Sequence, residues 1–325
     1  DMTTSHSGIP LGRAPTDESR GTTQTQPSDH NSKPRHDIDI MRRVLKPFLL
    51  LAGATAMTTL VTATLVGIRW QRATSREIAR LPHAASPAES QPLSIPKDLP
   101  TPVKRYFSFA LPDDLRQIHR TRIDWSGTFR ARPDGDWSPF TAVQHFSANP
   151  PGFVWDATIR MLPVVPVRVR DAYMDGEAVM DGRIGGLIRI VNEGGTPEIA
   201  ASALVRWIGE AMWFPTALLP REGLRWTSVD DKTARLTVAD RSIEVSADFH
   251  FDTSGAITGM TAMRYRDVDG QGVLTPFEGR YNRYERRGDF MIPAEAEVAW
   301  LLPEGRYAYW RGHVDDIVYE MSPVR

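Results

Sequence analysis

Apolar and polar side chains alternate at every second position over much of the C-terminal two-thirds of the chain. In the segment 242–251 one face carries only apolar residues: Ile243, Val245, Ala247, Phe249 and Phe251. The other face carries polar ones: Glu244, Ser246, Asp248 and His250. A helix would scatter the apolar set around its circumference, whereas a half-buried strand keeps it on one side. The segment is therefore predicted to be a β-strand.

The same alternation recurs in the segments 123–130, 140–146, 153–161, 256–266 and 294–302. Turn sequences separate these segments, among them 133–135 (PDG), 149–152 (NPPG) and 252–255 (DTSG). Short strands joined by such turns are typical of antiparallel sheets. We expect a mainly β (α+β) fold with about ten or eleven antiparallel strands, forming an incomplete barrel or strongly curved sheet.

Helical periodicity is confined to a few segments. Residues 102–110 form a short amphipathic candidate, and residues 197–212 form the clearest one. Thr196 can cap the second helix, Pro197 suits its first position, and Glu198 suits the positive end of its dipole. The following segment 213–220 is too apolar for a free loop. We expect the helix and this segment to cover the sheet as a lid.

The segment 48–68 has no charged residue over its whole length and reaches roughly 30 Å as a helix, the thickness of a hydrocarbon core. Basic residues flank both ends, and Trp70 suits a membrane interface. A transmembrane helix with basic flanks is therefore expected over residues 41–72. A buried core helix and a cleaved secretory signal beginning at Met41 are the alternatives.

Composition divides the remaining chain. Residues 1–40 are rich in polar residues and Pro and are expected to be a disordered tail, residues 73–98 a Pro/Ala-rich linker, and residues 99–325 the antiparallel β domain. The basic cluster before the span (MRRVLK) favours a cytoplasmic tail and a domain on the extracytoplasmic, periplasmic side of a single-pass membrane protein. The formal net charge of −1 argues against nucleic-acid binding.

Candidate chemistry is sparse. The chain has no Cys, so disulfides and thiol nucleophiles are excluded, and it contains no recognisable catalytic or phosphate-binding motif. The domain histidines, His119, His145, His250 and His313, are far apart in sequence, and Glu295 with Glu297 reads as a solvated strand face. We expect no catalytic residues, no metal site and no cofactor, and whether the protein is an enzyme stays open.

Two charges share faces with apolar residues. Asp171 shares a face with Tyr173, and Arg283 shares one with Tyr281. Inward charges are costly unless they are paired, so both indicate a buried ion pair, a position at a barrel rim, or a polar anchor in a ligand cavity. Aromatic residues on a curved sheet can line such a cavity or fill a core. The candidate ligand-binding residues are Trp125, Phe129, Phe153, Trp155, Asp171, Trp213, Phe214 and Arg283.

Several stretches resemble an uncharacterised bacterial family of membrane-anchored proteins over about residues 99–320. They are 99–107 (LPTPVKRYF), 137–144 (WSPFTAVQ), 152–155 (GFVW), 171–176 (DAYMDG) and 214–220 (FPTALLP). The expected strand number and helical lid are similar to the LolA/LolB lipoprotein-carrier fold, an incomplete barrel that cups acyl chains. A similar fold alone is a weak basis for function.

Three functions are compatible with the sequence. The first is a membrane-tethered module that binds a lipid or another hydrophobic ligand. The second is an envelope interaction or structural protein with a filled core and an unidentified protein partner. The third is an enzyme, for which some of His119, His145, His250, Asp171 and the Glu295/Glu297 pair would have to converge in one pocket.

Overall fold

The computed structural model describes residues 34–82, 93–161 and 165–322, and describes only the backbone of residues 34–40, 42 and 44. The chain divides into two compact units, Asp1–Thr59 and Leu60–Arg325. Most of the tail expected over residues 1–40 lies outside the described residues. Its last part is helical rather than disordered, because α1 begins at Pro34.

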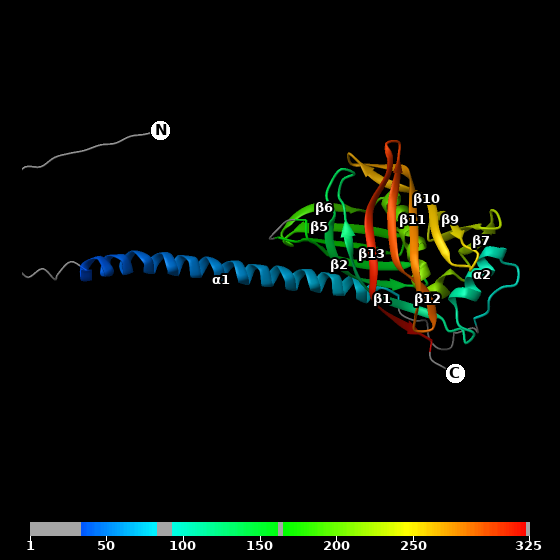
Figure 1. The fold of residues 1–325 in the computed structure, drawn as a ribbon, viewed down its shortest axis with the longest axis horizontal. Helices are drawn as coiled ribbons and strands as arrows, with labels where there is room; N and C mark the ends of the chain where they lie inside the picture. Colours follow the sequence, from blue (N-terminus) through cyan, green and yellow to red (C-terminus); the bar gives the residue numbers. More distant parts are fainter. Residues whose placement is uncertain (1–33, 83–92, 162–164, 323–325) are drawn as a thin grey trace, which may run out of the picture. The chain divides into compact units, whose positions relative to one another are not determined.

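The second unit is built around one antiparallel sheet (Figure 1). Within the described residues the sheet has thirteen strands: β1 (Ile118–Phe129), β2 (Ser138–Ser147), β3 (Gly152–Ile159), β4 (Val167–Met174), β5 (Glu177–Ile184), β6 (Ile188–Gly194), β7 (Leu224–Ser228), β8 (Thr233–Asp240), β9 (Ile243–Phe251), β10 (Ile257–Val268), β11 (Gln271–Arg287), β12 (Phe290–Leu302) and β13 (Gly305–Met321).

The topology is two meanders that meet at one seam. The strand order is β6-β5-β4-β3-β2-β1-β13-β12-β11-β10-β9-β8-β7, so β1 pairs with β13 and every other pair is consecutive in sequence. The sheet stays open, with β6 and β7 as its edges. Register shifts in the β1–β13 and β12–β13 pairs add to the ordinary strand twist and help the sheet curl into a half-barrel.

The expected fold class is confirmed, although the strand number is higher than the ten or eleven predicted. β6 shows why local alternation undercounts the strands. It is an edge strand whose residues Ile188, Arg189 and Ile190 are all exposed, so it carries no clear apolar face.

The helical lid is confirmed. α3 (Pro197–Glu210) begins as predicted, with the Thr196 hydroxyl accepting from the backbone N–H of Ile199 at 3.3 Å. Two 3-10 turns, η2 (Ala211–Trp213) and η3 (Pro215–Leu218), follow it and are fully buried. α2 (Thr101–Ala110), the other predicted helix, lies against β8 and β12.

The concave side of the sheet is filled by this lid. Indole N–H groups that would otherwise be buried without partners donate to backbone carbonyls: Trp207 to Ser147 at 3.1 Å and Trp213 to Pro293 at 2.7 Å. Tyr281 on β11 donates its hydroxyl proton to the Gly209 carbonyl of α3 at 2.8 Å. These bonds satisfy the polar ends of large aromatic side chains and fix the lid on the sheet.

α1 (Pro34–Arg80) continues beyond the expected 41–72 segment, and its last turns pack on the outer face of β3, β4 and β5. Trp70 is only 5% exposed, its indole donates to Asp156 at 2.8 Å, and Glu77 pairs with Arg170 at 2.8 Å. Residues 73–80 are therefore a docked helix rather than the start of a linker. Trp70, which was expected to suit a membrane interface, contacts the domain. The linker residues 83–92 lie outside the described residues.

One described helix has the length and composition of a membrane span. It covers Leu45–Arg80, and the other residues that the structure describes do not bury the side chains of its most apolar stretch. The predicted apolar span 48–68 lies within it.

Candidate functional site

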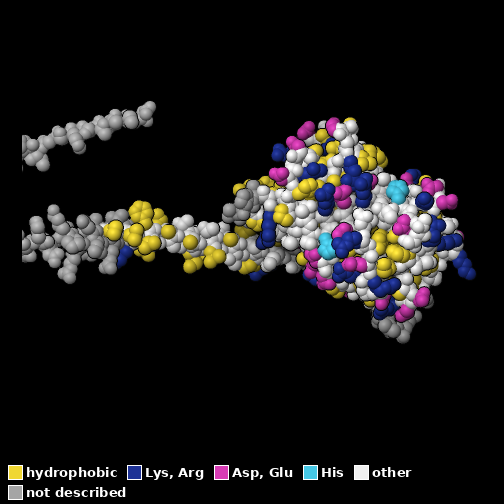
Figure 2. Space-filling view, in the orientation of Figure 1, with side chains coloured by type: hydrophobic (Ala, Val, Ile, Leu, Met, Phe, Trp, Pro, Cys, Tyr) yellow, Lys and Arg dark blue, Asp and Glu magenta, His cyan; other side chains and the backbone are white. Residues whose placement is uncertain are grey.

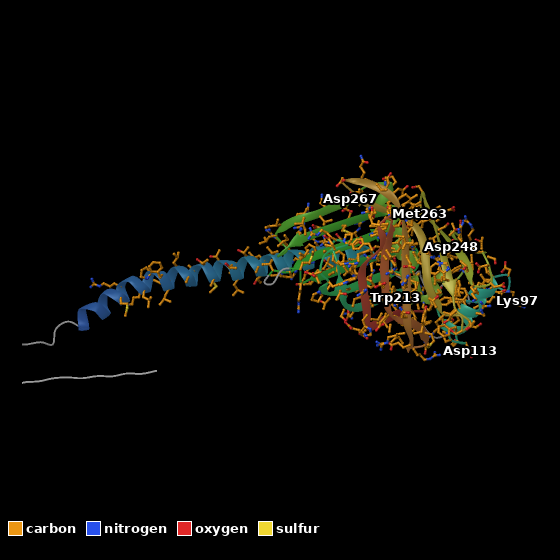
Figure 3. The ribbon with its side chains drawn as sticks, turned by 45° about the horizontal axis from the view of Figure 1, so that its top comes forward. Lys97, Asp113, Trp213, Asp248, Met263 and Asp267 are labelled. Carbon is orange, nitrogen blue, oxygen red and sulfur yellow. The ribbon has the colours of Figure 1, made fainter. Side chains whose placement is uncertain are left out.

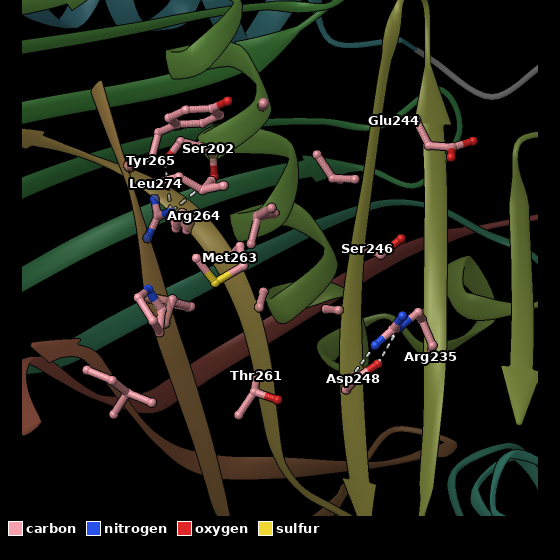
Figure 4. Close-up of a pocket in the computed structure, with 18 residues that line it drawn as sticks. Ser202, Arg235, Glu244, Ser246, Asp248, Thr261, Met263, Arg264, Tyr265 and Leu274 are labelled. Atoms are coloured by element: carbon pink, nitrogen blue, oxygen red, sulfur yellow. Dashed lines mark hydrogen bonds and ion pairs between the residues drawn. The ribbon is translucent and has the colours of Figure 1, made fainter. Parts of the chain in front are cut away.

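Strands β9 and β10 separate partway along their length. Their pairing runs from Ile257↔Phe251 to Ala262↔Ala247 and then stops. Beyond that point β9 stays paired with β8 as far as Ile243, and β10 stays paired with β11 as far as Val268. The two halves of the sheet therefore diverge, and a cleft opens between them (Figure 4).

Helix α3 forms the floor of this cleft. The Ser202 hydroxyl donates to the Tyr265 carbonyl of β10 at 2.9 Å. Arg264 donates from Nε to the Ser202 carbonyl at 3.1 Å and to the Ser202 hydroxyl at 3.0 Å. A helix thus supplies to β10 contacts that a neighbouring strand supplies elsewhere in the sheet. These bonds attach α3 to β10, so the helix covers the bottom of the cleft where the two strands no longer pair.

The cleft is a cavity of about 630 Å³ that is open to solvent. This volume falls within the range of roughly 300–1,000 Å³ common for small-molecule sites. We call it the β9–β10 cleft. Its lining residues are Ala201, Ser202, Val205, Arg235, Glu244, Val245, Ser246, Ala247, Asp248, Thr261, Ala262, Met263, Arg264, Tyr265, Leu274, Pro276, Phe277 and Leu301.

The walls of the cleft are mostly apolar, and its rim is charged. Met263 and Leu274 are 49% and 48% exposed, although both are large apolar residues. At the rim, Arg235 donates to both carboxylate oxygens of Asp248 at 2.7 and 2.8 Å. This bond holds the pKa of Asp248 below its ordinary value, so the carboxyl stays ionised near neutral pH. Asp248 and Met263 come from the two separating strands (Figure 3).

Arg264 joins the cleft to the aromatic interior. Its guanidinium lies 4.9 Å from the ring centroid of Phe277 and 5.6 Å from that of Trp300, and it donates to the Tyr309 hydroxyl at 3.0 Å. Tyr309 in turn contacts the ring of Phe129 at 6.3 Å between centroids. Phe129, one of the ligand-binding residues predicted from sequence, is thus connected to the cleft residue Arg264 through Tyr309.

Four of the predicted ligand-binding residues are packed in the core. Trp125, Phe153, Trp213 and Phe214 are at most 2% exposed, and Trp125 meets Trp213 edge-on at 4.8 Å between centroids. Trp155 is 6% exposed and packs on Phe140. A ligand could occupy their positions only by displacing close-packed rings, which is costly.

Asp171 is one acid of a buried polar network. Arg206 of α3 donates to Asp171 at 2.7 Å and to Glu210 at 3.0 Å. Gln144 donates to Glu210 at 2.8 Å and accepts from the indole of Trp125 at 3.1 Å. The ion-pair alternative considered for Asp171 is thus the one the structure contains.

The network holds two acids on one cation. Burial raises the pKa of Glu210 above its ordinary value, and the attraction of Arg206 only partly offsets this. Burial also disfavours the charged form of Arg206, but attraction to Glu210 and Asp171 outweighs it, so the pKa of Arg206 lies above its ordinary value. Arg206 therefore stays charged.

Arg283 does not face inward, and its prediction as an inward polar anchor is wrong. Its backbone has a positive φ of 55°, which interrupts the alternation that begins with Phe277 and Tyr281. The side chain is 63% exposed and pairs with Glu295 at 2.6 Å. The next residue, Tyr284, reaches inward instead and donates to the Ile257 carbonyl.

The other titratable candidates bind different partners. His119 contacts Ser322, His250 contacts Thr233 and Thr261, and Glu297 pairs with Arg306 and Arg311. Burial, together with Arg120 and Arg122, lowers the pKa of His145 to about 4. In the part of the chain that the structure describes, no three His, Asp or Glu residues form a group that could hold a metal ion.

The cleft residues were not predicted from sequence. One signal pointed to them: Arg264 and Arg266 occupy the strand positions that continue the apolar face of Met260 and Ala262. Two charges on an inward face show that the strand is leaving the core. Where β9 and β10 stop pairing depends on register between strands, which local alternation does not specify.

Comparison with protein families gives a match to the β domain. Residues 97–319 match the family of unknown function DUF6920. The chain belongs to this family. The match covers the β domain from α2 through β13 and therefore includes the β9–β10 cleft. The expected membership in a family without an established activity is confirmed. A comparison with curated proteins found no match.

Some solved structures are similar to part of this chain. A domain from Vibrio parahaemolyticus named for outer membrane lipoprotein sorting is 8% identical, with 62% of this chain and 86% of that chain covered and a TM-score of 0.34. A LolA superfamily protein from Nitrosomonas europaea is 12% identical, with 68% and 93% covered and a TM-score of 0.28. With TM-scores this low, neither structure carries weight for the function of this chain.

Proposed function

We propose that the protein is a membrane-tethered, extracytoplasmic module that binds a lipid or another hydrophobic ligand in the β9–β10 cleft. One observation carries the proposal: two strands separate over a cavity of about 630 Å³ whose half-exposed walls include Met263 and Leu274. Large apolar side chains left accessible in a concave site are typical of ligand pockets.

The chemistry of the cleft suits an amphiphile. Met263 and Leu274 offer accessible apolar contact to a chain, while the charged rim around Arg235 lies where a polar head would remain in water. In this proposal the ligand binds beside the aromatic core rather than within it. The sequence suggested a cavity among Trp125, Trp213 and Phe214. We propose the neighbouring β9–β10 cleft as the binding site instead.

A photoactivatable fatty acid tests the proposal. The full chain is placed in nanodiscs, crosslinked, and digested for mass spectrometry. We expect labelled peptides from β10 and β11 around Met263 and Leu274, in addition to any from α1. Labelling of α1 alone would show that the probe reports only lipid around the helix and would contradict the proposal.

A matched pair of variants separates binding from stability. Met263→Lys combined with Leu274→Lys places two charges on the apolar walls, and both positions are half-exposed, so the fold is retained. We expect labelling of β10 and β11 to fall about tenfold, the effect of roughly 1.4 kcal/mol. Val318→Lys, at a residue 53% exposed on β13 and outside the cleft, is the control. Equal losses in both variants would argue against a specific site.

The filled core favours a second candidate, in which the cleft binds an extended protein segment. The diverging parts of β9 and β10 leave backbone groups without a strand partner, and such edges can accept an added strand. A photo-crosslinking amino acid at Met263, activated in bacterial membranes, distinguishes the two candidates. A lipid adduct supports the first, and a protein adduct that shifts the band by kilodaltons supports the second.

A further inference from the structure

Large apolar side chains are exposed at one end of the sheet. Leu187, in the turn between β5 and β6, is 59% exposed, and Ile188 and Ile190 of β6 are 64% and 50% exposed. Met161 and Val165, on either side of the β3–β4 connection, are 40% and 38% exposed. We call these five residues the tip patch. Exposed apolar residues gathered in this way mark interaction surfaces.

The glycine turn beside the tip patch lies against helix α1. A Cβ atom added to Gly186 would lie 2.8 Å from Cγ1 of Val66, and one added to Gly185 would lie 3.0 Å from Cγ1 of Val165. Both glycines have positive φ, as this tight turn requires. Figure 1 shows the ends of β5 and β6 beside α1, and Figure 2 shows hydrophobic side chains where the domain borders the helix.

The contact with Val66 sets the depth of the patch. Val66 belongs to the apolar span 48–68 and precedes its end by two residues, or about 3 Å along the helix axis. If this span crosses a bilayer, the turn beside Val66 is at the level of the hydrocarbon boundary. Leu187 and Ile188 would then be exposed to lipid rather than to water.

Arginines stand immediately behind the apolar residues. Arg69 and Arg72 on α1 are exposed just past the span. Arg160 precedes Met161 and is exposed, and Arg189, between the two exposed isoleucines, is half-exposed and pairs with Asp181 at 3.2 Å. Apolar tips backed by arginines match a lipid surface, with apolar side chains among the acyl chains and guanidinium groups at the phosphates.

We propose that the tip patch inserts into the lipid bilayer beside the transmembrane helix, so that the β domain rests directly on the membrane surface. This inference rests on the span assigned in the proposed function. The docked end of α1 supports it, because Trp70 and Leu81 are fixed on the sheet only a few turns beyond the span. The domain is therefore seated on the bilayer by two attachments, the helix and the tip.

Because the chain has no Cys, single cysteines can carry an environment-sensitive fluorophore. Leu187→Cys reports on the tip, Val61→Cys reports on the span, and Val229→Cys, 51% exposed outside the tip patch, is the aqueous control. Each labelled full chain is placed in nanodiscs that contain lipids with a nitroxide near the top of the acyl chain. Iodide is added separately as the aqueous quencher.

We expect the label at position 187 to be quenched by the lipid nitroxide and to resist iodide about fivefold better than the label at 229, as expected for a residue at the acyl boundary. Lipid quenching at 61 without quenching at 187 would overturn the inference and leave the span intact. No lipid quenching at either position would reject the span itself. Protection of 187 from both quenchers would indicate a protein covering the patch and would also overturn the inference.

Discussion

Arg206 neutralises two buried acids inside the half-barrel, and this makes it the residue on which the interior depends most. Its guanidinium also lies 4.9 Å from the ring centroid of Phe153 and 5.1 Å from that of Trp155. Replacing it with Met preserves volume but leaves Asp171 and Glu210 buried without a cation. We expect Arg206→Met to lower the free energy of unfolding by about 3–5 kcal/mol, measured by urea denaturation of the full chain in detergent.

Glu210→Gln is the informative companion variant. The new amide still contacts Gln144, and Arg206 still pairs with Asp171. The loss of free energy of unfolding should therefore be much smaller than in Arg206→Met. The raised pKa of Glu210 also gives a pH effect: its contribution favours folding below the unfolded value near 4.5 and is lost as the pH rises through the higher folded value. The variant should flatten that dependence. An Arg206→Met protein as stable as the parent would contradict this account of the network.

His145 predicts a second pH dependence of the opposite sign. Its folded pKa of about 4 lies below the ordinary value of 6.5, so the unfolded chain binds the proton first as the pH falls. Stability should be lost between about pH 6.5 and 4, by an amount on the order of 1 kcal/mol after solvent screening. His145→Gln should remove this slope in denaturation midpoints measured across that range. A slope that persists in His145→Gln would contradict this assignment.

At the scale of elements, local patterns were sufficient wherever a segment has one apolar face. The predicted strand 242–251 matches β9, and the predicted helix at Pro197 begins there because its cap, proline and acidic residue are all local signals. The prediction at Arg283 was wrong because one left-handed residue reverses the alternation. The β9–β10 cleft was missed because it is a property of pairing between strands. The extension of α1 to Arg80 follows from contacts with β3 and β4 that no local pattern contains.

The docking of α1 gives a prediction at this scale. Burial raises the pKa of Asp156, and bonds from Trp70 and Thr74 favour its charged form. Trp70→Phe keeps an aromatic ring but removes the indole N–H. The hydrogen bond from this donor to a charged acceptor contributes roughly 1.5 kcal/mol to stability. We expect amide hydrogen exchange in residues 70–81 to accelerate about tenfold.

Asp156→Asn provides the control for that prediction. In this variant the same indole bond goes to a neutral acceptor, so Trp70→Phe should cost less when it is combined with Asp156→Asn than when it is made alone. If Trp70→Phe accelerates exchange equally in both backgrounds, or in neither, the bond between Trp70 and Asp156 does not hold α1 on the domain.

At the scale of the whole molecule, the proposed membrane anchor raises the question of which side of a membrane the domain would occupy. The basic cluster of Arg42, Arg43 and Lys46 precedes the span, and the positive-inside rule favours a cytoplasmic location for that end. The arginines after the span have a different role in our proposal, because Arg69 and Arg72 lie beside the tip patch at the lipid phosphates. These arginines after the span therefore count less against this orientation than the basic cluster before the span counts in its favour.

This orientation predicts which single cysteines a membrane-impermeant maleimide reaches in intact spheroplasts. Val229→Cys in the domain should be labelled at once, whereas Met41→Cys, before the span, should be labelled only after the membrane is permeabilised. The parent chain has no Cys and serves as the blank. The reverse pattern would place the domain in the cytoplasm. With the predicted pattern, and with the domain resting on the bilayer as we propose, a ligand of the β9–β10 cleft would come from the outer leaflet or the space outside it.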